Sequence, residues 1–206
     1  MKVSENLIHE SAEIHPTVEI GINSRVWHFA QIRENASIGS DCVLSRGVYI
    51  GPGVLIGNSV KLQNYSLIYQ PTVIEDYVFV GPGAIITNDL LPRSTDDVGN
   101  LKDADDWNSK GVRLKKGASI GANAVVLDGI TVGEWAMVGA SALVSQSVPD
   151  YGLVVGNPAR LVGWVGRHGF KLLKEQKYWV CPKTGTKYLE KDGILSPVEK
   201  KSPGDI

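Results

Sequence analysis

The sequence predicts an all-β protein that winds as a parallel coil with three flat sides. From Ile8 to Ile86 every sixth residue is aliphatic. Four residues after each of these positions stands a small or β-branched residue, up to Ala84, and Leu90 is expected to fill the next such slot. A period of six fits neither an alternating strand nor an α-helix. It indicates short strands joined by corners, three to a coil.

Each six-residue unit is expected to form one side and one corner of the coil. Its aliphatic and small residues point inward, and polar residues or glycines make the bend. A single coil cannot bury its aliphatic face alone, so coils stack at the strand spacing of about 4.8 Å, and residues 18 apart lie above one another. An ordinary sandwich or barrel would instead show variable strand spacing and alternating residues.

One long segment interrupts the repeat. The six-residue step resumes at Leu114 and continues to Val144, whereas an unbroken repeat would place its next aliphatic residue at position 92. About 22 polar residues are therefore inserted at one corner, and we predict an external loop at about 91–113. Long loops in compact folds commonly have a function.

Turn residues after Val148 end the coils. We expect the coiled unit to occupy residues 1–160. The remainder, 161–206, is expected to contain a helix (over about 160–176), a hairpin around Thr184-Gly185 and a tail. A helix at this place would cover the exposed edge of the last coil.

Composition limits the classes of partner. The net charge of −1 predicts no general attraction to nucleic acid, and no apolar run is long enough to span a bilayer. The start of the chain lacks the form of a signal peptide, so a cytoplasmic location is expected. Cys42 and Cys181 form neither a disulfide framework nor a metal-binding spacing. His28 has no histidine partners at coil spacing, which argues against a metal-dependent carbonic anhydrase and predicts no metal.

Four strings resemble those of a known family: "VWHFAQIRENASIG", "VFVGPGAIITNDLLPRS", "LKKGASIGANAVVLDGITVG" and "VVGNPARLVGW". They are similar to the left-handed parallel β-helix (hexapeptide-repeat) acyltransferases, and in particular to nucleotide-sugar 3-N-acetyltransferases of the UDP-2-acetamido-3-amino-2,3-dideoxy-glucuronate type. The resemblance covers roughly residues 8–173. It implies a left-handed coil, a homotrimer with active sites between neighbouring prisms, acetyl-CoA as co-substrate, and a role in O-antigen biosynthesis.

The histidines favour an amine acceptor over a hydroxyl acceptor. An alcohol must lose a proton as it attacks a thioester, so O-acetyltransferases need a general base, usually histidine. A neutral amine attacks with its lone pair and loses its proton afterwards. None of the four histidines lies in the inserted segment or beside Asn88; they are His9, His15, His28 and His168.

Asn88 is the predicted catalytic residue. It lies two positions past the inward Ile86, so its side chain is expected to point outward at the corner where the insertion begins. Its carbonyl oxygen can accept a hydrogen bond from the amine and orient the lone pair. The resemblance maps the family's "TN" onto Thr87-Asn88 and assigns this Asn to the sugar amine. Alternatively, Asn merely tolerates the left-handed backbone of a corner.

Counting back in steps of 18 from Thr87 and Asn88 gives the expected substrate wall, which is Arg33, Glu34, Tyr69 and Gln70. Arg33 is placed to meet a diphosphate, although a solvated Arg–Glu pair is an equal alternative. His28 lies on another face and is predicted to enter the cleft from a neighbouring subunit; the alternative is a structural histidine.

Small corner residues are expected to let the pantetheine arm of acetyl-CoA approach the backbone. Cationic side chains are expected to bind the phosphates of the coenzyme. The predicted cofactor set is Lys115, Lys116, Ala122, Gly139, Ala140 and Arg160. Arg160 is placed near the coenzyme by the resemblance of "GNPAR". Glycine-rich corners are also what the repeat itself requires.

Three other functions stay open on the sequence alone. They are a dTDP-3-amino-3,6-dideoxyhexose N-acetyltransferase, an O-acetyltransferase and a non-catalytic solenoid. The sequence leaves undecided the base of the nucleotide, the presence of a carboxylate on the sugar, the acyl chain and the final glycan.

Overall fold

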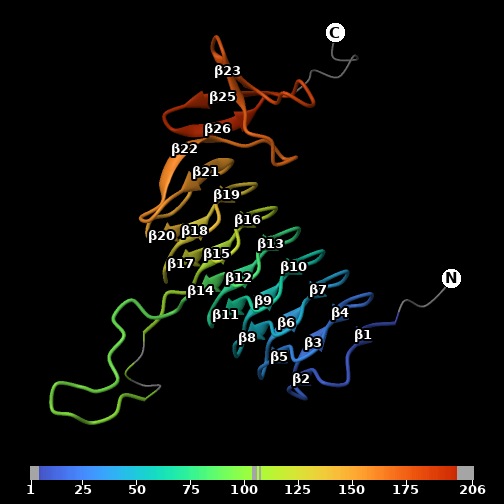
Figure 1. Ribbon diagram of the computed structural model, residues 1–206, viewed down its shortest axis with the longest axis vertical. Coiled ribbons are helices and arrows are strands. Elements are labelled where there is room, and N and C mark those ends of the chain that lie inside the picture. The colour runs from blue at the N-terminus through green and yellow to red at the C-terminus, as the bar shows by residue number, and fades with distance from the viewer. Residues whose placement is uncertain (1–4, 104–105, 107, 199–206) are drawn as a thin grey trace, which may run out of the picture.

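The computed structural model describes residues 5–103, 106 and 108–198. Two-residue strands wind into a three-sided prism, and a small antiparallel sheet lies at its C-terminal end (Figure 1). The described residues contain no α-helix, and so none that could cross a membrane. The predicted all-β fold, a parallel β-helix of six-residue repeats, is confirmed.

Each side of the prism is a parallel sheet whose strands come from every third repeat. The first wall contains β1 (Leu7–Ile8), β4 (Arg25–Val26), β7 (Val43–Leu44), β10 (Lys61–Leu62), β13 (Phe79–Val80), β16 (Ser119–Ile120) and β19 (Met137–Val138), followed by β21 (Gly152–Val155) and β22 (Arg160–Trp164). The second wall contains β2 (Glu13–Ile14), β5 (Gln31–Ile32), β8 (Tyr49–Ile50), β11 (Leu67–Ile68), β14 (Ile85–Ile86), β17 (Val125–Val126) and β20 (Leu143–Val144). The third wall contains β3 (Glu19–Ile20), β6 (Ser37–Ile38), β9 (Leu55–Ile56), β12 (Val73–Ile74), β15 (Arg113–Leu114) and β18 (Thr131–Val132).

Strand register confirms the insertion. Leu7 pairs with Arg25, 18 residues on, whereas Val73 pairs with Arg113, 40 residues on, so one coil contains 22 extra residues. These residues project from the prism between β14 and β15 (Figure 1). The prediction for Leu90 is wrong: its side chain is 51% exposed, and the buried Val112 takes its slot because the chain has already left the prism.

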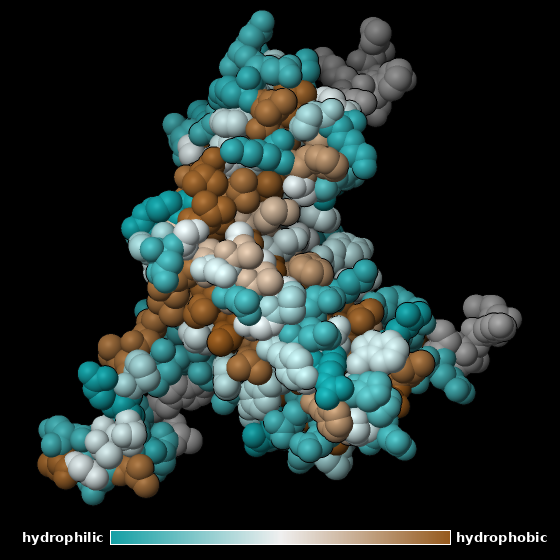
Figure 2. Space-filling model, in the orientation of Figure 1, coloured by the Kyte–Doolittle hydropathy of each residue, from teal (hydrophilic) through white to brown (hydrophobic). Residues whose placement is uncertain are grey.

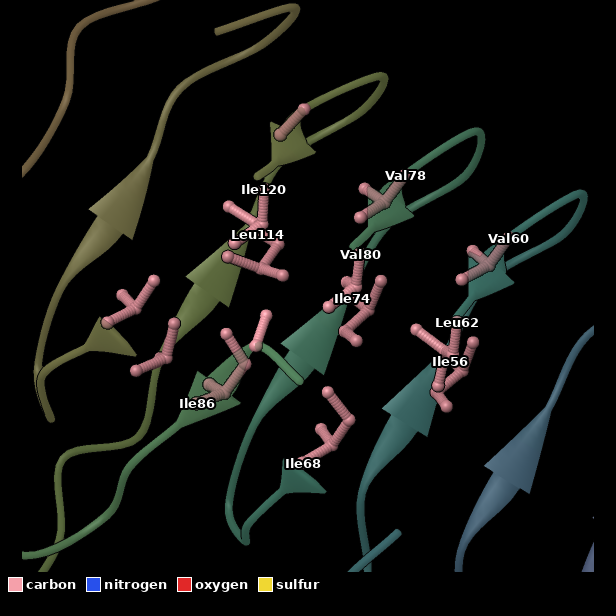
Figure 3. Packing of buried hydrophobic residues seen from close by; sticks show 14 of the residues in the cluster. Ile56, Val60, Leu62, Ile68, Ile74, Val78, Val80, Ile86, Leu114 and Ile120 are labelled. Carbon is pink, nitrogen blue, oxygen red and sulfur yellow. The ribbon is translucent and has the colours of Figure 1, made fainter. Parts of the chain in front are cut away.

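The aliphatic residues at the six-residue step point into the prism, where they stack in ladders (Figure 3). Ile68 and Ile86 are fully buried, and the intervening small slots hold residues such as Val78. Burial of this continuous apolar column stabilises the coils. Cys42 fills another of the small slots and is also fully buried. Ile8, in the first coil, is about half exposed because only one neighbouring coil covers it.

Three corners join the walls. The first corner, between the first and second walls, comprises 9–11, 27–29, 45–47, 63–65, 81–83, 121–123 and 139–141. The second corner, between the second and third walls, comprises 15–17, 33–35, 51–53, 69–71, 87–88, 127–129 and 145–147. The third corner, between the third and first walls, comprises 21–23, 39–41, 57–59, 75–77, 115–117 and 133–135. Many corners place a residue with positive φ at their third position, for example Asn35 and Gly117. This left-handed conformation turns the chain.

The predicted helix over 160–176 is wrong. β22 instead pairs antiparallel with β21, and β23 (Leu173–Glu175) follows. Gly163 and Gly169 adopt φ of +149° and +76°, which no helix accommodates. The edge of the first wall is therefore covered by a strand.

The predicted hairpin at Thr184-Gly185 is confirmed. It joins β24 (Tyr178–Val180) to β25 (Lys187–Lys191), and the Gly185 N–H donates to the Cys181 carbonyl over 2.8 Å. With β23 and β26 (Ile194–Pro197) these strands form a four-stranded sheet that has its own core. Residues 199–206 of the predicted tail lie outside the described residues.

Candidate active site

The second corner places Asn88 where the chain leaves the prism. β14 ends at Ile86, and the Thr87 hydroxyl donates to the Val126 carbonyl over 3.2 Å, which holds the start of the loop against the next coil. Asn88 is partly buried. Since Ile68 pairs with Ile86, Asn88 lies one coil above Gln70 at the same corner, as the 18-residue count predicts.

Asp128 anchors the return of the loop. It occupies the position equivalent to Asn88 in the next coil and is only 4% exposed. Its carboxylate accepts hydrogen bonds from the Ser109 hydroxyl (2.6 Å) and from the N–H groups of Lys110 (3.0 Å) and Gly111 (2.7 Å). Burial tends to raise the pKa of this carboxyl, but these hydrogen bonds outweigh burial and lower the pKa. The sequence analysis missed Asp128.

A pocket of about 570 Å³ lies between the loop and the second corner. Its lining is Gln70, Asp89, Leu90, Leu91, Arg93, Lys102, Asp103, Asp106 and Asn108. The pocket adjoins Asn88 through Asp89, so the predicted Gln70 and Asn88 lie at one place. Arg93 and Lys102 add cations that the sequence analysis did not select, because the loop has no repeat from which to place them.

Arg33 and Glu34 form an ion pair two coils below Gln70. The Arg33 Nε lies 2.8 Å from Glu34 Oε2, and both side chains are partly exposed. The hydrogen bond to Glu34 raises the pKa of Arg33, while hydrogen bonds from the Glu34 backbone and from Arg33 lower the pKa of Glu34. Tyr69, two coils above Arg33, packs at a tilt against Tyr49 with ring centroids 5.2 Å apart.

The first corner holds His28 and the small residues of the predicted coenzyme set. His28 stacks on His9 with ring centroids 3.5 Å apart. Farther along the same corner lie Ala122, Gly139 and Ala140. A Cβ on Gly139 would lie 2.8 Å from Val155, so close stacking of the chain requires this glycine whatever its role.

Backbone donors distinguish the first corner from the third. At the third corner, side chains of the following coil accept from the second corner residue, for example Asp76 from the Asn58 N–H and Asp150 from the Glu134 N–H. For Ala122 and Ala140, at the equivalent place on the first corner, no such acceptor is found within the described residues. Within the described residues the Ala122 and Ala140 N–H groups therefore lack the side-chain acceptor that the third corner provides.

Arg160 begins β22 opposite Val155, next to the coil of Gly139. Its guanidinium donates to the Ala159 carbonyl over 2.9 Å. Arg160 thus lies toward the end of the corner that contains Ala140.

Lys115 and Lys116 lie apart from the other predicted coenzyme residues, on the third corner. The ammonium of Lys115 is 3.4 Å from the carboxylate of Asp150, and that of Lys116 is 5.5 Å from the ring centroid of Tyr77. Within one chain these two lysines do not meet Ala122 and Ala140. No cluster of three potential metal ligands occurs in the part of the chain that the structure describes.

Residues 53–88 match the family model described as bacterial transferase hexapeptide (six repeats). The structure extends the same six-residue repeat along the prism on both sides of this match. The chain is 48% identical, over 83 residues, to the dTDP-3-amino-3,6-dideoxy-alpha-D-galactopyranose 3-N-acetyltransferase of Aneurinibacillus thermoaerophilus, a match covering 40% of this chain and 43% of that one. It is 41% identical, over 147 residues, to a chloramphenicol acetyltransferase of Agrobacterium fabrum, covering 70% and 59% respectively. The chain thus spans about half the length of these curated relatives.

Solved structures share the fold of this chain. A mutant of AntD, an N-acyltransferase from Bacillus cereus in complex with dTDP and coenzyme A, has a TM-score of 0.54 at 24% identity, with 79% of this chain and 82% of that chain covered. The acetyltransferase domain of PglB from Neisseria gonorrhoeae has a TM-score of 0.51 at 20% identity, with 77% and 58% covered.

Proposed function

We propose that this chain is an acetyl-CoA-dependent N-acetyltransferase that acts on the 3-amino group of a nucleotide-linked amino sugar. The observation on which the proposal chiefly rests is the position of Asn88, at the corner where the loop begins and beside the loop pocket. The name of the relative from Aneurinibacillus thermoaerophilus, a sugar 3-N-acetyltransferase, supports the reaction class. The reaction belongs to the biosynthesis of a cell-surface glycan, O-antigen in particular, and takes place in the cytoplasm.

In the proposed reaction the neutral amine attacks the thioester carbonyl of acetyl-CoA. A C–N bond forms, and the carbonyl π electrons move to oxygen. As the oxyanion collapses, the C–S bond breaks, coenzyme A leaves as a thiolate, and the proton released by the amine neutralises it. Asn88 Oδ1 accepts a hydrogen bond from the amine N–H and aims the lone pair at the carbonyl carbon.

The first corner is the proposed site of the coenzyme. The N–H groups of Ala122 and Ala140, which have no side-chain acceptor within the described residues, would donate to amide carbonyls of the pantetheine arm or to the oxyanion. Gly139 has no side chain that would hold the coenzyme away from the backbone of this corner. Arg160 supplies a cation for the phosphates. Lys115 and Lys116 would have to reach the same coenzyme from the third corner of a neighbouring subunit.

We further propose a homotrimer in which the second corner of one subunit faces the first corner of the next. The loop exposes large aliphatic side chains to solvent, among them Leu91 (81%), Val98 (77%) and Leu101 (81%). Figure 2 shows hydrophobic, brown surface on the projecting segment. Asp96 nevertheless orders the loop tip by accepting hydrogen bonds from Val98 and Asn100. An ordered loop with exposed aliphatics indicates contact with another protein surface.

The favoured acceptor is a UDP-linked 2-acetamido-3-amino uronic sugar, as the sequence resemblance implies. Arg33, Glu34, Tyr69 and Gln70 would line one side of its cleft, and Arg93 and Lys102 offer cations for its carboxylate. The 48% identity to a relative named for a dTDP-linked substrate favours a second candidate, a dTDP-3-amino-3,6-dideoxyhexose.

A substrate panel tests the proposal. Release of free coenzyme A is measured with UDP- and dTDP-linked 3-amino sugars, with and without a carboxylate at carbon 6, and with the matching 3-hydroxy sugars and chloramphenicol. We expect turnover on one amine with a product heavier by one acetyl group. Turnover confined to hydroxyl compounds would establish an O-acetyltransferase. No release of coenzyme A with any compound of the panel would favour a non-catalytic solenoid.

A further inference from the structure

A second pocket, of about 300 Å³, lies on the first corner near the N-terminal end of the prism. It is lined by Trp27, His28, Ser45, Arg46 and Asn64, which come from three successive coils. Of these, the sequence analysis selected only His28. The pocket is separate from the loop pocket, which lies on the second corner.

Flat aromatic faces form one side of this pocket. The rings of Trp27 and His28 are nearly parallel, with an interplanar angle of 3° and centroids 6.4 Å apart, and His9 stacks behind His28. Trp27 and the adjacent Phe29 are both exposed, Phe29 by 57%. Exposed, mutually aligned rings are suited to stacking against another planar ring, such as a nucleobase.

Arg46 supplies a fixed cation beside these rings. Its Nε donates to the Tyr65 hydroxyl over 2.8 Å, and its guanidinium lies 4.8 Å from the centroid of the Phe29 ring. Within the described residues Arg46 forms no ion pair, whereas Arg33 is paired with Glu34 and Arg113 with Glu75. An oriented guanidinium without a carboxylate partner is a good ligand for phosphate oxygens.

We propose that this pocket binds a nucleoside diphosphate, and specifically that of the sugar substrate. The base stacks on the Trp27–His28 face, and the diphosphate contacts Arg46. Ser45 and Asn64, on the same corner, offer hydrogen-bonding groups to the ligand. The proposal relies on the proposed function for the source of the nucleotide, because coenzyme A also contains a base and a diphosphate.

The position of this pocket agrees with the proposed trimer, in which the first corner of one subunit faces the second corner of its neighbour. The pocket occupies coils below those of Ala122 and Ala140 on the same corner, so the coenzyme and the nucleotide would enter from opposite ends. In the proposed trimer, Arg46 would then face the Arg33–Glu34 wall of the neighbouring subunit. Arg33, whose positive charge is compensated by the Glu34 carboxylate, would contact the ligand. Arg46 would provide a positive charge that no carboxylate of the described residues compensates.

Calorimetric titration of the full chain with UDP, dTDP and coenzyme A tests the site without requiring turnover. The variants are Arg46→Ala, Arg46→Lys and Trp27→Ala. The matched control is Arg113→Ala, which removes an exposed arginine from the third wall. We expect the Kd of UDP or dTDP to rise by about tenfold or more in Arg46→Ala and Trp27→Ala, to rise less in Arg46→Lys, and to stay unchanged in the control. The Kd of coenzyme A should not change.

Several results would overturn the assignment. They are no binding of either nucleotide by the wild type, equal Kd values in Arg46→Ala and wild type, weakening of coenzyme A alone, or a changed oligomeric state with nucleotide affinity intact. The site and the reaction can fail separately. Nucleotide binding that depends on Arg46, without acetyl transfer, would refute the proposed reaction but not the nucleotide site. Acetylation of a nucleotide sugar with an unchanged KM in Arg46→Ala would refute the nucleotide site but not the proposed reaction.

Discussion

Replacing Asp128 by alanine should loosen the base of the loop and destabilise the prism. The wild-type carboxylate is nearly fully buried and accepts three hydrogen bonds of 2.6–3.0 Å. Hydrogen bonds to a charged group contribute about 1.5–3 kcal/mol each, and losses within one cluster are not additive. We therefore expect the free energy of unfolding to fall by about 3–5 kcal/mol in Asp128→Ala.

The effect should depend on pH with a definite sign. Because the folded pKa of Asp128 is lowered, its contribution is complete above the unfolded pKa of about 3.9 and is lost as the pH falls through the folded value. The stability difference between wild type and variant should shrink in this acidic range.

Urea unfolding at pH 7 and at steps below pH 4 measures both effects. Asp97→Ala is the matched control, because it removes an exposed loop carboxylate whose oxygens accept no hydrogen bond from the described residues. It should change stability by less than about 0.5 kcal/mol. Equal stability of wild type and Asp128→Ala at pH 7, or a difference that grows in acid, would refute the role given to this carboxylate.

Two further predictions concern the corners and the loop. Gly117 and Gly53 both adopt positive φ, +68° and +64°, but a Cβ on Gly117 would lie 2.3 Å from the Trp135 ring, whereas nothing lies within 4 Å of one on Gly53. Gly53→Ala should lower the free energy of unfolding by about 1–2 kcal/mol because of its backbone conformation alone. Gly117→Ala should lower it by about 1–3 kcal/mol more, because the added Cβ also meets Trp135. Equal losses of the two variants in chemical denaturation would contradict this packing. If the proposed trimer forms, the double change Leu91→Ser, Leu101→Ser should shift it to smaller species in light scattering while leaving the circular dichroism of the protein unchanged. An intact trimer would show that the loop leucines do not hold the subunits together.

The prism could be predicted from the sequence because its period has a single physical origin. Each inward position, such as Ile68 or Leu114, must be aliphatic to fill the same ladder, so the pattern reports the coil directly. The 22-residue insertion was visible for the same reason. Leu90 was misplaced because counting alone cannot show where the chain leaves the prism and where Val112 restores the slot.

The C-terminal segment could not be predicted in the same way. Leu161 and Val162 suit either a helix or a strand, and pairing with β21 decides for the strand. The site residues divide likewise. Asn88 follows from its place two positions past Ile86, and Gln70 from the count of 18. Asp128 appears only once the insertion is skipped, and Arg46 only once the corner brings Phe29 and Tyr65 beside it.

The most direct test of the proposed chemistry is the kcat of Asn88→Ala on the best amine substrate of the panel. If Asn88 orients the amine, kcat should fall by about 100-fold or more while the Kd of coenzyme A stays unchanged. Asn108→Ala, which alters another asparagine at the rim of the loop pocket, should leave kcat within a few-fold of wild type. A wild-type kcat in Asn88→Ala would contradict the central claim.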